Sequence, residues 1–518
     1  LGKYPEAAEA HRRALGIFED LSRSEEAFIQ RILLTKALQK AGDLEGAEKT
    51  ALDGLAQAED DRNLYAQIML LHELGEIHRS LFQLREALEY HRRELTAAEQ
   101  IGSPDAVTFA IESIADIQID LGSYDEAFAM LQRGIALAGE LTQQYTLHSL
   151  LLDRAWLHTE RGDVAAAETD AEKARAIAGK LDYKKGEAEA LGTLGSVAAA
   201  AGRFNDAIEY TEGAIGIFKD LERRGEVATG YNNLGTLLTD MERYPEAESA
   251  FNKAKQQSED LEDKRGIAVA ELNLATMYNE RSEFRRALET SKKALEFYTE
   301  LGHAPGIVRS NMVIAASLSD LGQMNEAVLY SDRALDKAKM IGDVSLLANA
   351  LGNRGVLHAE IGEFRRAASY YENALELVEE KGMPLEIATQ QMHLAGIYAD
   401  LGKFDTALEY AEKAKQIYSH QGLAGSTADA LHLIADLYAE WGRYEKGLEF
   451  EKQALALRRQ LGLKKETAES LNNLGLLLAD TGDEEGARTH LDEAMDIFLE
   501  IEYPAGISSV HNNIGVID

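Results

Sequence analysis

The chain of 518 residues contains no cysteine, only six prolines and only two tryptophans. The absence of cysteine excludes disulfides and thiolate metal sites, so packing alone must hold the fold together. No apolar run approaches the 18 residues that a membrane-spanning helix needs, and no signal peptide is recognisable. We therefore predict a protein without a membrane partner, located in the cytoplasm.

Positive charge is also scarce. The 54 Lys and Arg residues stand against 89 Asp and Glu residues, which gives a formal net charge of −35. This balance argues against nucleic acid or an anionic membrane as the partner, because both are polyanions. A partner segment that carries Lys or Arg fits better. The alternative is that the acidic composition only keeps the protein soluble.

One phrase, Gly followed by four residues and Ala, recurs along the whole sequence. It begins at residues 2, 42, 122, 162, 202, 322, 362, 402 and 482, with degenerate copies at 82, 242, 282 and 442. Every spacing is a multiple of 40, so thirteen copies follow one another without insertion or deletion. The sequence therefore predicts a single continuous array over residues 1–518, with no linker and no second domain.

Each unit is predicted to contain two helices. We number the columns of a unit from the glycine position, so that column −7 precedes it by seven residues. Columns +5 and +12 are mostly Ala, column −8 is mostly Leu or Ile, and column −7 is Gly or Ala in every unit except at Thr35. All six prolines fall where a helix should begin. Helix A thus precedes the glycine, helix B follows it, and the fold is predicted to be all-α.

The motif Tyr231-x2-Leu234-Gly235-x2-Leu238, followed by Ala247-x3-Phe251, resembles the tetratricopeptide repeat, whose usual unit has 34 residues. The longer unit of 40 residues is similar to kinesin light chains, to the Pins/LGN adaptors and to bacterial signalling regulators with such repeats. The resemblance implies a right-handed superhelical α-solenoid of about thirteen helix-turn-helix units. It also implies a non-catalytic scaffold, adaptor or sensor that binds a partner peptide or helix in a concave groove lined by helix A.

Asparagine recurs in column −9 of helix A. The members are Asn233, Asn273, Asn353, Asn473 and Asn513, with Asn232, Asn472 and Asn512 beside them in column −10. An amide both donates and accepts hydrogen bonds, so a ladder of amides suits the backbone of an extended peptide. In the kinesin light chain and Pins/LGN types the asparagines of this column bind ligand backbone, and the resemblance implies the same for these five. The alternative is that they bond to a neighbouring helix or to water.

Column −2 is acidic in most units. Its members are Asp120, Glu160, Asp240, Glu280, Asp320, Glu360, Asp400, Glu440 and Asp480. An anion near the C-terminal end of a helix opposes the helix dipole, so local helix stability does not explain the column. Two explanations stay open. The carboxylates form salt bridges to the next unit, or they form an acidic ribbon in the groove that attracts a Lys- or Arg-bearing segment.

Catalytic and metal motifs are not recognisable. There is no Gly-rich phosphate loop and no G-x-S-x-G elbow, so we predict neither an enzyme nor a cofactor. His78, His158 and His358 lie in column −4 and are expected to pack, and the spacing in 72-HELGEIH-78 does not match a zinc helix. Only Arg309 supplies a cation in columns −13 and −9, so acidic C-terminal tails are not expected to bind as they do to chaperone-binding members of the resembled family.

The first predicted helix, at residues 3–21, is a helix B without its helix A. The last predicted helix, at residues 506–518, is a helix A without its helix B. Solenoids need polar capping units at their ends. We therefore expect the chain to be a fragment of a longer protein, with any effector domain outside it. The alternative is head-to-tail self-association of copies, which favours a structural or spacer role over an adaptor.

Overall fold

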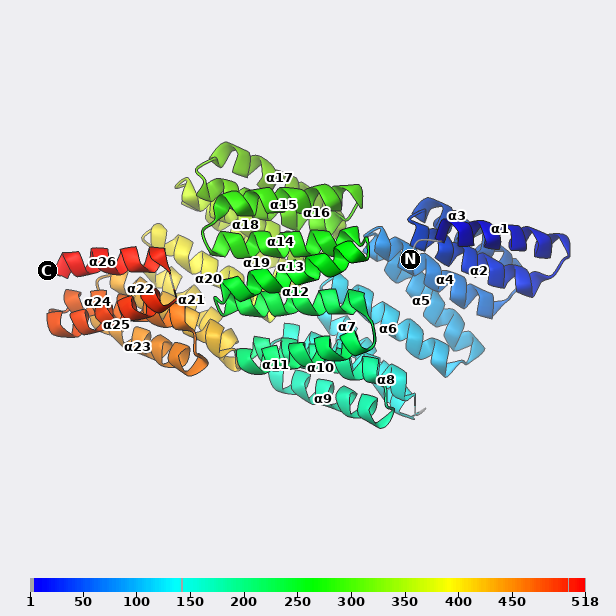
Figure 1. The fold of residues 1–518 in the computed structure, drawn as a ribbon, viewed down its shortest axis with the longest axis horizontal. Helices are drawn as coiled ribbons and strands as arrows, with labels where there is room; N and C mark the ends of the chain where they lie inside the picture. The colour runs from blue at the N-terminus through cyan, green and yellow to red at the C-terminus, as the bar shows by residue number, and fades with distance from the viewer. Residues whose placement is uncertain (1–3, 141–142, 502, 518) are drawn as a thin grey trace. The chain divides into compact units, whose positions relative to one another are not determined.

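The structure is a computed structural model that describes residues 4–140, 143–501 and 503–517. These residues form 26 α-helices and no strand, and consecutive helices pack against one another (Figure 1). The predicted all-α repeat solenoid is confirmed. Within the described ranges, no helix combines the length and the apolar character that a membrane crossing requires. The first predicted turn, at residue 2, lies outside the described residues.

The even-numbered helices are the predicted helices A. Their bounds are α2 Ser24–Ala41, α4 Leu64–Ser80, α6 Pro104–Asp120, α8 Gln144–Glu160, α10 Lys184–Ala200, α12 Arg224–Asp240, α14 Lys264–Glu280, α16 Ala304–Asp320, α18 Val344–Glu360, α20 Pro384–Asp400, α22 Ala424–Glu440, α24 Lys464–Asp480 and α26 Pro504–Ile517.

The odd-numbered helices are the predicted helices B. Their bounds are α1 Tyr4–Asp20, α3 Leu44–Asp60, α5 Leu84–Ile101, α7 Tyr124–Glu140, α9 Val164–Lys180, α11 Phe204–Asp220, α13 Tyr244–Asp260, α15 Phe284–Glu300, α17 Met324–Ile341, α19 Phe364–Glu380, α21 Phe404–His420, α23 Tyr444–Leu461 and α25 Glu484–Glu500. As predicted from the sequence, prolines stand in the first turn of α6, α13, α16 and α20.

From position 42 to position 482, the residue in the glycine column ends helix A in the left-handed conformation. Gly402, for example, has φ 71°, and the non-glycine residues Glu242 and Ser282 in the same column keep φ 59° and 62°. After α12, the N–H of Glu242 donates to the carbonyl of Thr239 and the N–H of Arg243 donates to that of Leu238, both at 2.8 Å. This pair of bonds is a Schellman motif, which satisfies carbonyls that the helix leaves open. The turn geometry therefore explains the glycine column.

Helix A and helix B of one unit approach closely at column −7. A Cβ atom on Gly235 would lie 2.5 Å from the ring of Phe251, which occupies column +9 of the same unit. Leu234 and Leu238 flank this contact and share a buried cluster with Phe251. The residues of column −7 are thus small because a side chain larger than a methyl group would meet helix B, and at Gly235 even a methyl group would.

In several units the residues in columns −7 and +9 are complementary in size. Glycine in column −7 accompanies a large residue in column +9, as in Gly75 with His91 and Gly355 with Tyr371, and in both pairs an added Cβ would lie 2.8 Å or less from the ring. Alanine in column −7 accompanies a small residue at the pairs Ala275 with Ser291, Ala315 with Ser331 and Ala395 with Ala411. In these five units the size of the residue in column +9 follows the space left by column −7, whereas the pairs Ala115 with Leu131 and Ala435 with Glu451 combine alanine with a large residue.

Contacts between Cα atoms divide the chain into two compact units. The first holds residues up to Leu157 together with 173–182 and 340–343, and the second holds 158–172, 183–339 and 344–518. The repeat period runs through both without a break in the sequence. A single continuous array as one domain stays a prediction.

Replacing Gly235 by Ala should lower the free energy of unfolding by about 1 to 3 kcal/mol, because the new methyl group overlaps the Phe251 ring. Gly396→Ala is the matched control in α20, where an added Cβ meets no atom within 4 Å. It should stabilise the protein by about 0.5 to 1 kcal/mol through helix propensity. Urea denaturation measures both. Shifts of the midpoint in the same direction for the two variants would contradict the packing argument.

Candidate binding face of the helices A

The acidic column lies at the C-terminal ends of the helices A. Asp240, Glu280, Asp320, Glu360 and Asp400 are the last residues of α12, α14, α16, α18 and α20. All five are exposed, whereas Asp120 and Glu160 are half-buried. Because the units repeat without insertion, one carboxylate per unit leaves its helix at an equivalent position.

The exposed members of the column differ from Asp120 in their ion pairing. Asp120 lies 3.0 Å from the guanidinium of Arg79, which comes from the preceding helix A. Among the described residues, none of these five carboxylates forms an ion pair, and neither do Glu440 and Asp480, which are also exposed. Glu360 accepts a hydrogen bond from the hydroxyl of Ser319. The explanation by salt bridges between units therefore applies to Asp120 and not to the exposed stretch.

Burial raises the pKa values of four carboxylates of this stretch, Asp240, Glu280, Asp320 and Asp400. The side chains keep exposed surface, yet the surrounding protein displaces enough water to raise the pKa of Asp240 to about 6. Burial and then the charge of Asp240 raise the pKa of Glu280 to about 6. Burial and the charge of Glu360 likewise raise the pKa of Asp320. Neighbouring members thus repel one another, and a cation placed between them would relieve the repulsion.

A lysine of the chain itself approaches one end of this stretch. Lys465, near the start of α24, lies 3.3 Å from the carboxylate of Glu242 in the turn after α12. Its charge also acts to lower the pKa of Glu280, although burial outweighs it. This contact lies within the second compact unit and places a cation near one member of the column, Glu280.

The asparagines of column −9 mostly bond to the preceding helix A. Asn513 donates to the amide oxygen of Asn472 at 2.8 Å, and Asn273 makes a longer bond of 3.4 Å to Asn232. Asn353 donates to the backbone carbonyl of Met312 at 3.5 Å. These bonds correspond to the alternative in which the amides hold neighbouring helices.

Asn473 and Asn233 differ from these three. Asn473 donates to Asp436 at 2.5 Å and to Glu451 at 3.1 Å. Asn233 is exposed and has no hydrogen-bond partner among the described side chains and backbone. A ligand-binding role for the column stays a prediction, and Asn233 is the member whose amide is most available for it.

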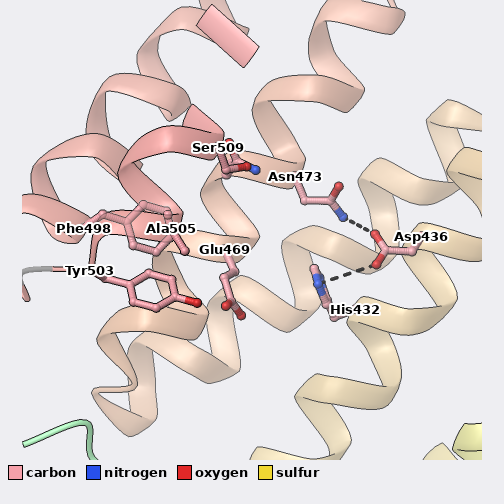
Figure 2. A pocket seen from close by; sticks show the side chains of 10 residues that line it. His432, Asp436, Glu469, Asn473, Phe498, Tyr503, Ala505 and Ser509 are labelled. Carbon is pink, nitrogen blue, oxygen red and sulfur yellow. Dashed lines mark hydrogen bonds and ion pairs between the residues drawn. The ribbon is translucent and has the colours of Figure 1, made fainter. Parts of the chain in front are cut away.

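A pocket of about 360 Å³ opens where α22, α24 and the start of α26 meet (Figure 2). Asp436, Glu469 and Asn473 supply polar groups from two successive helices A, while Phe498 and Tyr503 supply aromatic surface. The volume lies at the lower end of the range of ligand pockets. Of the predicted site residues, the structure brings Asn472 and Asn473 into this pocket, and it does not bring the acidic column into it.

The polar side of the pocket is a hydrogen-bonded network. Figure 2 shows Asp436 between His432 and Asn473. His432 Nδ1 lies 2.8 Å from Glu451 Oε2, and its Nε2 lies 3.7 Å from Asp436. Burial lowers the pKa of His432, but the hydrogen bond to Glu451 and the charge of Asp436 outweigh it, so the net shift is upward. With Glu469 nearby, the pocket carries a surplus of acidic groups and suits a cationic group.

Sequence reasoning did not single out His432, Asp436 or Glu469. Asp436 lies in column −6 and Glu469 in column −13, which share the helix face of column −9. A comparison of these columns between neighbouring units would have found both acids. The prediction that the histidines of column −4 pack is confirmed for His78 and His358, which are buried and stack on Tyr90 and Tyr370.

Asn473→Ala should lower the free energy of unfolding by about 1 to 3 kcal/mol, because Asp436 and Glu451 both lose a donor in a semi-buried network. Asn233→Ala, in the same column, should change it by less than about 0.5 kcal/mol. Thermal denaturation of the two variants checks the difference. Equal effects would show that the column has one common role instead of two.

Comparisons with known proteins were made on sequence and on structure. The family model described as tetratricopeptide repeat matches residues 226–300, 307–380, 386–460 and 442–500, which together make up about half of the chain. No curated protein sequence matches significantly.

Solved structures resemble parts or most of the chain. BtubC (BKLC) from P. vanneervenii is 22% identical over 43% of this chain and 92% of its own, with a TM-score of 0.36. A Rap protein complexed with competence and sporulation factor is 17% identical over 68% and 98%, with a TM-score of 0.47. The APC/C hetero-tetramer Cut9-Hcn1 is 12% identical over 98% and 96%, with a TM-score of 0.42. At these identities and scores nothing about function follows.

Proposed function

Because the chain belongs to the tetratricopeptide repeat family, we propose that it is a non-catalytic scaffold that binds an extended partner segment rich in Lys and Arg along its helices A. Repeats of this family generally mediate contacts between proteins, and stacked repeats provide long binding surfaces. Its cytoplasmic location and a role in signalling stay predictions.

The unpaired acidic stretch is the observation that carries the proposal. Asp240, Glu280, Asp320 and Glu360 lie one per unit, and no cation of the described chain forms an ion pair with them. Partial burial of such carboxylates without ion-pair partners costs free energy, which the raised pKa values of Asp240, Glu280 and Asp320 report. A segment that places one Lys or Arg near each unit would neutralise them and would be steered by the same charges.

The asparagines and the pocket have separate parts in this proposal. Asn233, which is exposed and lies on the same helix as Asp240, would bond the ligand backbone, while the asparagines bonded to neighbouring helices would hold those helices in place. The pocket beside Asp436 and Glu469 would receive one further cationic side chain, with the rings of Phe498 and Tyr503 against its aliphatic part.

An extended peptide of alternating arginine and serine should bind, and its affinity should fall as salt rises, because the contacts are exposed charges. Charge reversal at all four of Asp240, Glu280, Asp320 and Glu360, each to Lys, should weaken binding at least tenfold. The matched control reverses four acids at the ends of helices B, namely Asp220, Asp260, Glu300 and Glu380, which gives the same net charge. Fluorescence anisotropy measures all three proteins.

An equal loss of affinity in the two fourfold variants would show that net charge alone attracts the peptide, and the proposed face would be wrong. A peptide of alternating glutamate and serine serves as the second control and should not bind to the parent chain.

Binding of the arginine peptide should weaken when the pH falls from about 7.5 to 5.5, because Asp240 and Glu280, with pKa values of about 6, become protonated while arginine keeps its charge. Near pH 6 a bound cation favours the ionised carboxylates, so binding should release protons. Calorimetry in two buffers with different ionisation heats measures this release.

Folding stability depends on pH in the opposite direction to peptide binding, because these carboxyl groups stabilise the folded state when they are protonated. A carboxyl with a raised pKa in the folded state contributes most stability below the ordinary carboxyl pKa and loses it as the pH rises through about 4 to 6. If the affinity for the arginine peptide does not change between pH 7.5 and 5.5 and binding releases no proton, Asp240 and Glu280 do not belong to the interface.

A further inference from the structure

Two histidines and a glutamate converge between α4 and α5 in the first compact unit. Nδ1 of His72, on α4, lies 3.5 Å from Oε1 of Glu94 on α5, and Nδ1 of His91 lies 2.8 Å from Oε2 of the same carboxylate. One ligand-type atom from each residue lies within 4.8 Å of the others. The side chains of His91 and Glu94 are fully buried, and that of His72 is 17% exposed.

Several of these buried atoms lack hydrogen bonds. His72 Nδ1, Glu94 Oε1 and His91 Nε2 have no hydrogen-bond partner among the described residues. Buried polar atoms without partners are costly and uncommon. A proton shared by His91 and Glu94 explains their 2.8 Å contact, but it leaves His72 Nδ1 and Glu94 Oε1 facing each other without a bond.

The separation of these two atoms fits a shared metal ion. Ligand atoms at 2.0 to 2.1 Å from a tetrahedral Zn²⁺ lie about 3.3 Å apart, close to the observed 3.5 Å. Glu76 Oε1 lies 3.6 Å from His91 Nε2, so it stands where an outer carboxylate would orient the ring while Nδ1 binds metal. The ring of Phe109, 4.6 Å from that of His72, supplies apolar surroundings.

The network beside the pocket of α22 and α24 offers an internal comparison. His432, Asp436 and Glu451 occupy the same three columns, −10, −6 and +9, as His72, Glu76 and His91. In that network only one residue is an imidazole, and Asn473 completes the hydrogen bonding. No atom of those three residues is buried without a partner, in contrast to the cluster at His72.

We propose that His72, His91 and Glu94 bind a divalent transition-metal ion of the zinc class and so tie α4 to α5. Two imidazole nitrogens and one carboxylate oxygen form a ligand set that zinc favours. Binding displaces the proton between His91 and Glu94, and a fourth position is left for water. The exposed edge of His72 provides the way in for the ion. Within its own helix, His72 has only the spacing to His78, which does not match a zinc helix, so the sequence predicted no metal.

The test titrates zinc chloride into the full chain after it has been stripped with a chelator. Isothermal calorimetry should show about one zinc ion per chain, and zinc should raise the melting temperature. Glu94→Gln, which keeps the shape of the side chain, should weaken zinc binding at least tenfold and abolish the thermal shift. His432→Asn, in the equivalent column of the other cluster, should change neither result.

Absence of zinc binding to the stripped parent chain at submillimolar zinc would overturn the proposal in favour of a cluster that holds only a proton. So would unchanged affinity in Glu94→Gln, or a loss confined to His432→Asn. If Glu94→Gln fails to fold, as judged by circular dichroism, His72→Asn replaces it, because His72 is partly exposed and its loss leaves the buried pair intact.

Discussion

The rest of the structure depends on one constraint: between Ser22 and Gly482, every twentieth residue that the structure describes has the left-handed conformation. It ends each helix after seventeen or eighteen residues at both turns of most units, and Arg62 and Glu242 adopt it although a side chain there costs about 1 kcal/mol relative to glycine. Because the turns are equal in length, equivalent residues of successive helices A fall at equivalent places. A single acidic residue per unit thereby becomes a column of charge.

Close packing of helix A on helix B is the second constraint, and it determines where polar residues can enter. Gly75 has no side chain, and a Cβ atom there would lie 2.3 Å from His91, so the histidine occupies space that an alanine would take. In another unit, Phe251 occupies the column of His91 and packs on Gly235 as an apolar contact. The buried cluster of His72, His91 and Glu94 is thus a variation on a packing contact that recurs along the chain.

The positions of the turns and helices could be predicted from the sequence because the repeat period is strictly 40 residues. The phrase at every fortieth residue predicted the turn positions, and the prolines predicted the starts of α6, α13, α16 and α20. Columns also predicted which face of helix A is buried. For the asparagines the sequence left two alternatives open, because the bonds of Asn273 and Asn513 to column −10 of the preceding helix A depend on the rotation between successive units.

Contacts between neighbouring helices were the part that sequence reasoning could not supply. The period gives the register along each helix, but not how far helix B is rotated against helix A, so His91 and Glu94 could not be placed beside His72. The available signal was His91 in column +9, which holds an uncharged residue in most other units, for example Ala51, Phe251 and Ser291. Likewise, the contact of Lys465 with Glu242 joins repeats six units apart, which no local pattern indicates.

The helix A face, and not net charge, is the proposed binding surface of this tetratricopeptide repeat protein. Hydrogen exchange of the chain with and without the bound arginine peptide, read by mass spectrometry, tests this most directly. Binding at this face predicts slower exchange in the C-terminal turns of α12, α14, α16 and α18, with the odd-numbered helices between them unchanged. Protection confined to the odd-numbered helices, or spread evenly over the acidic surface, would contradict it.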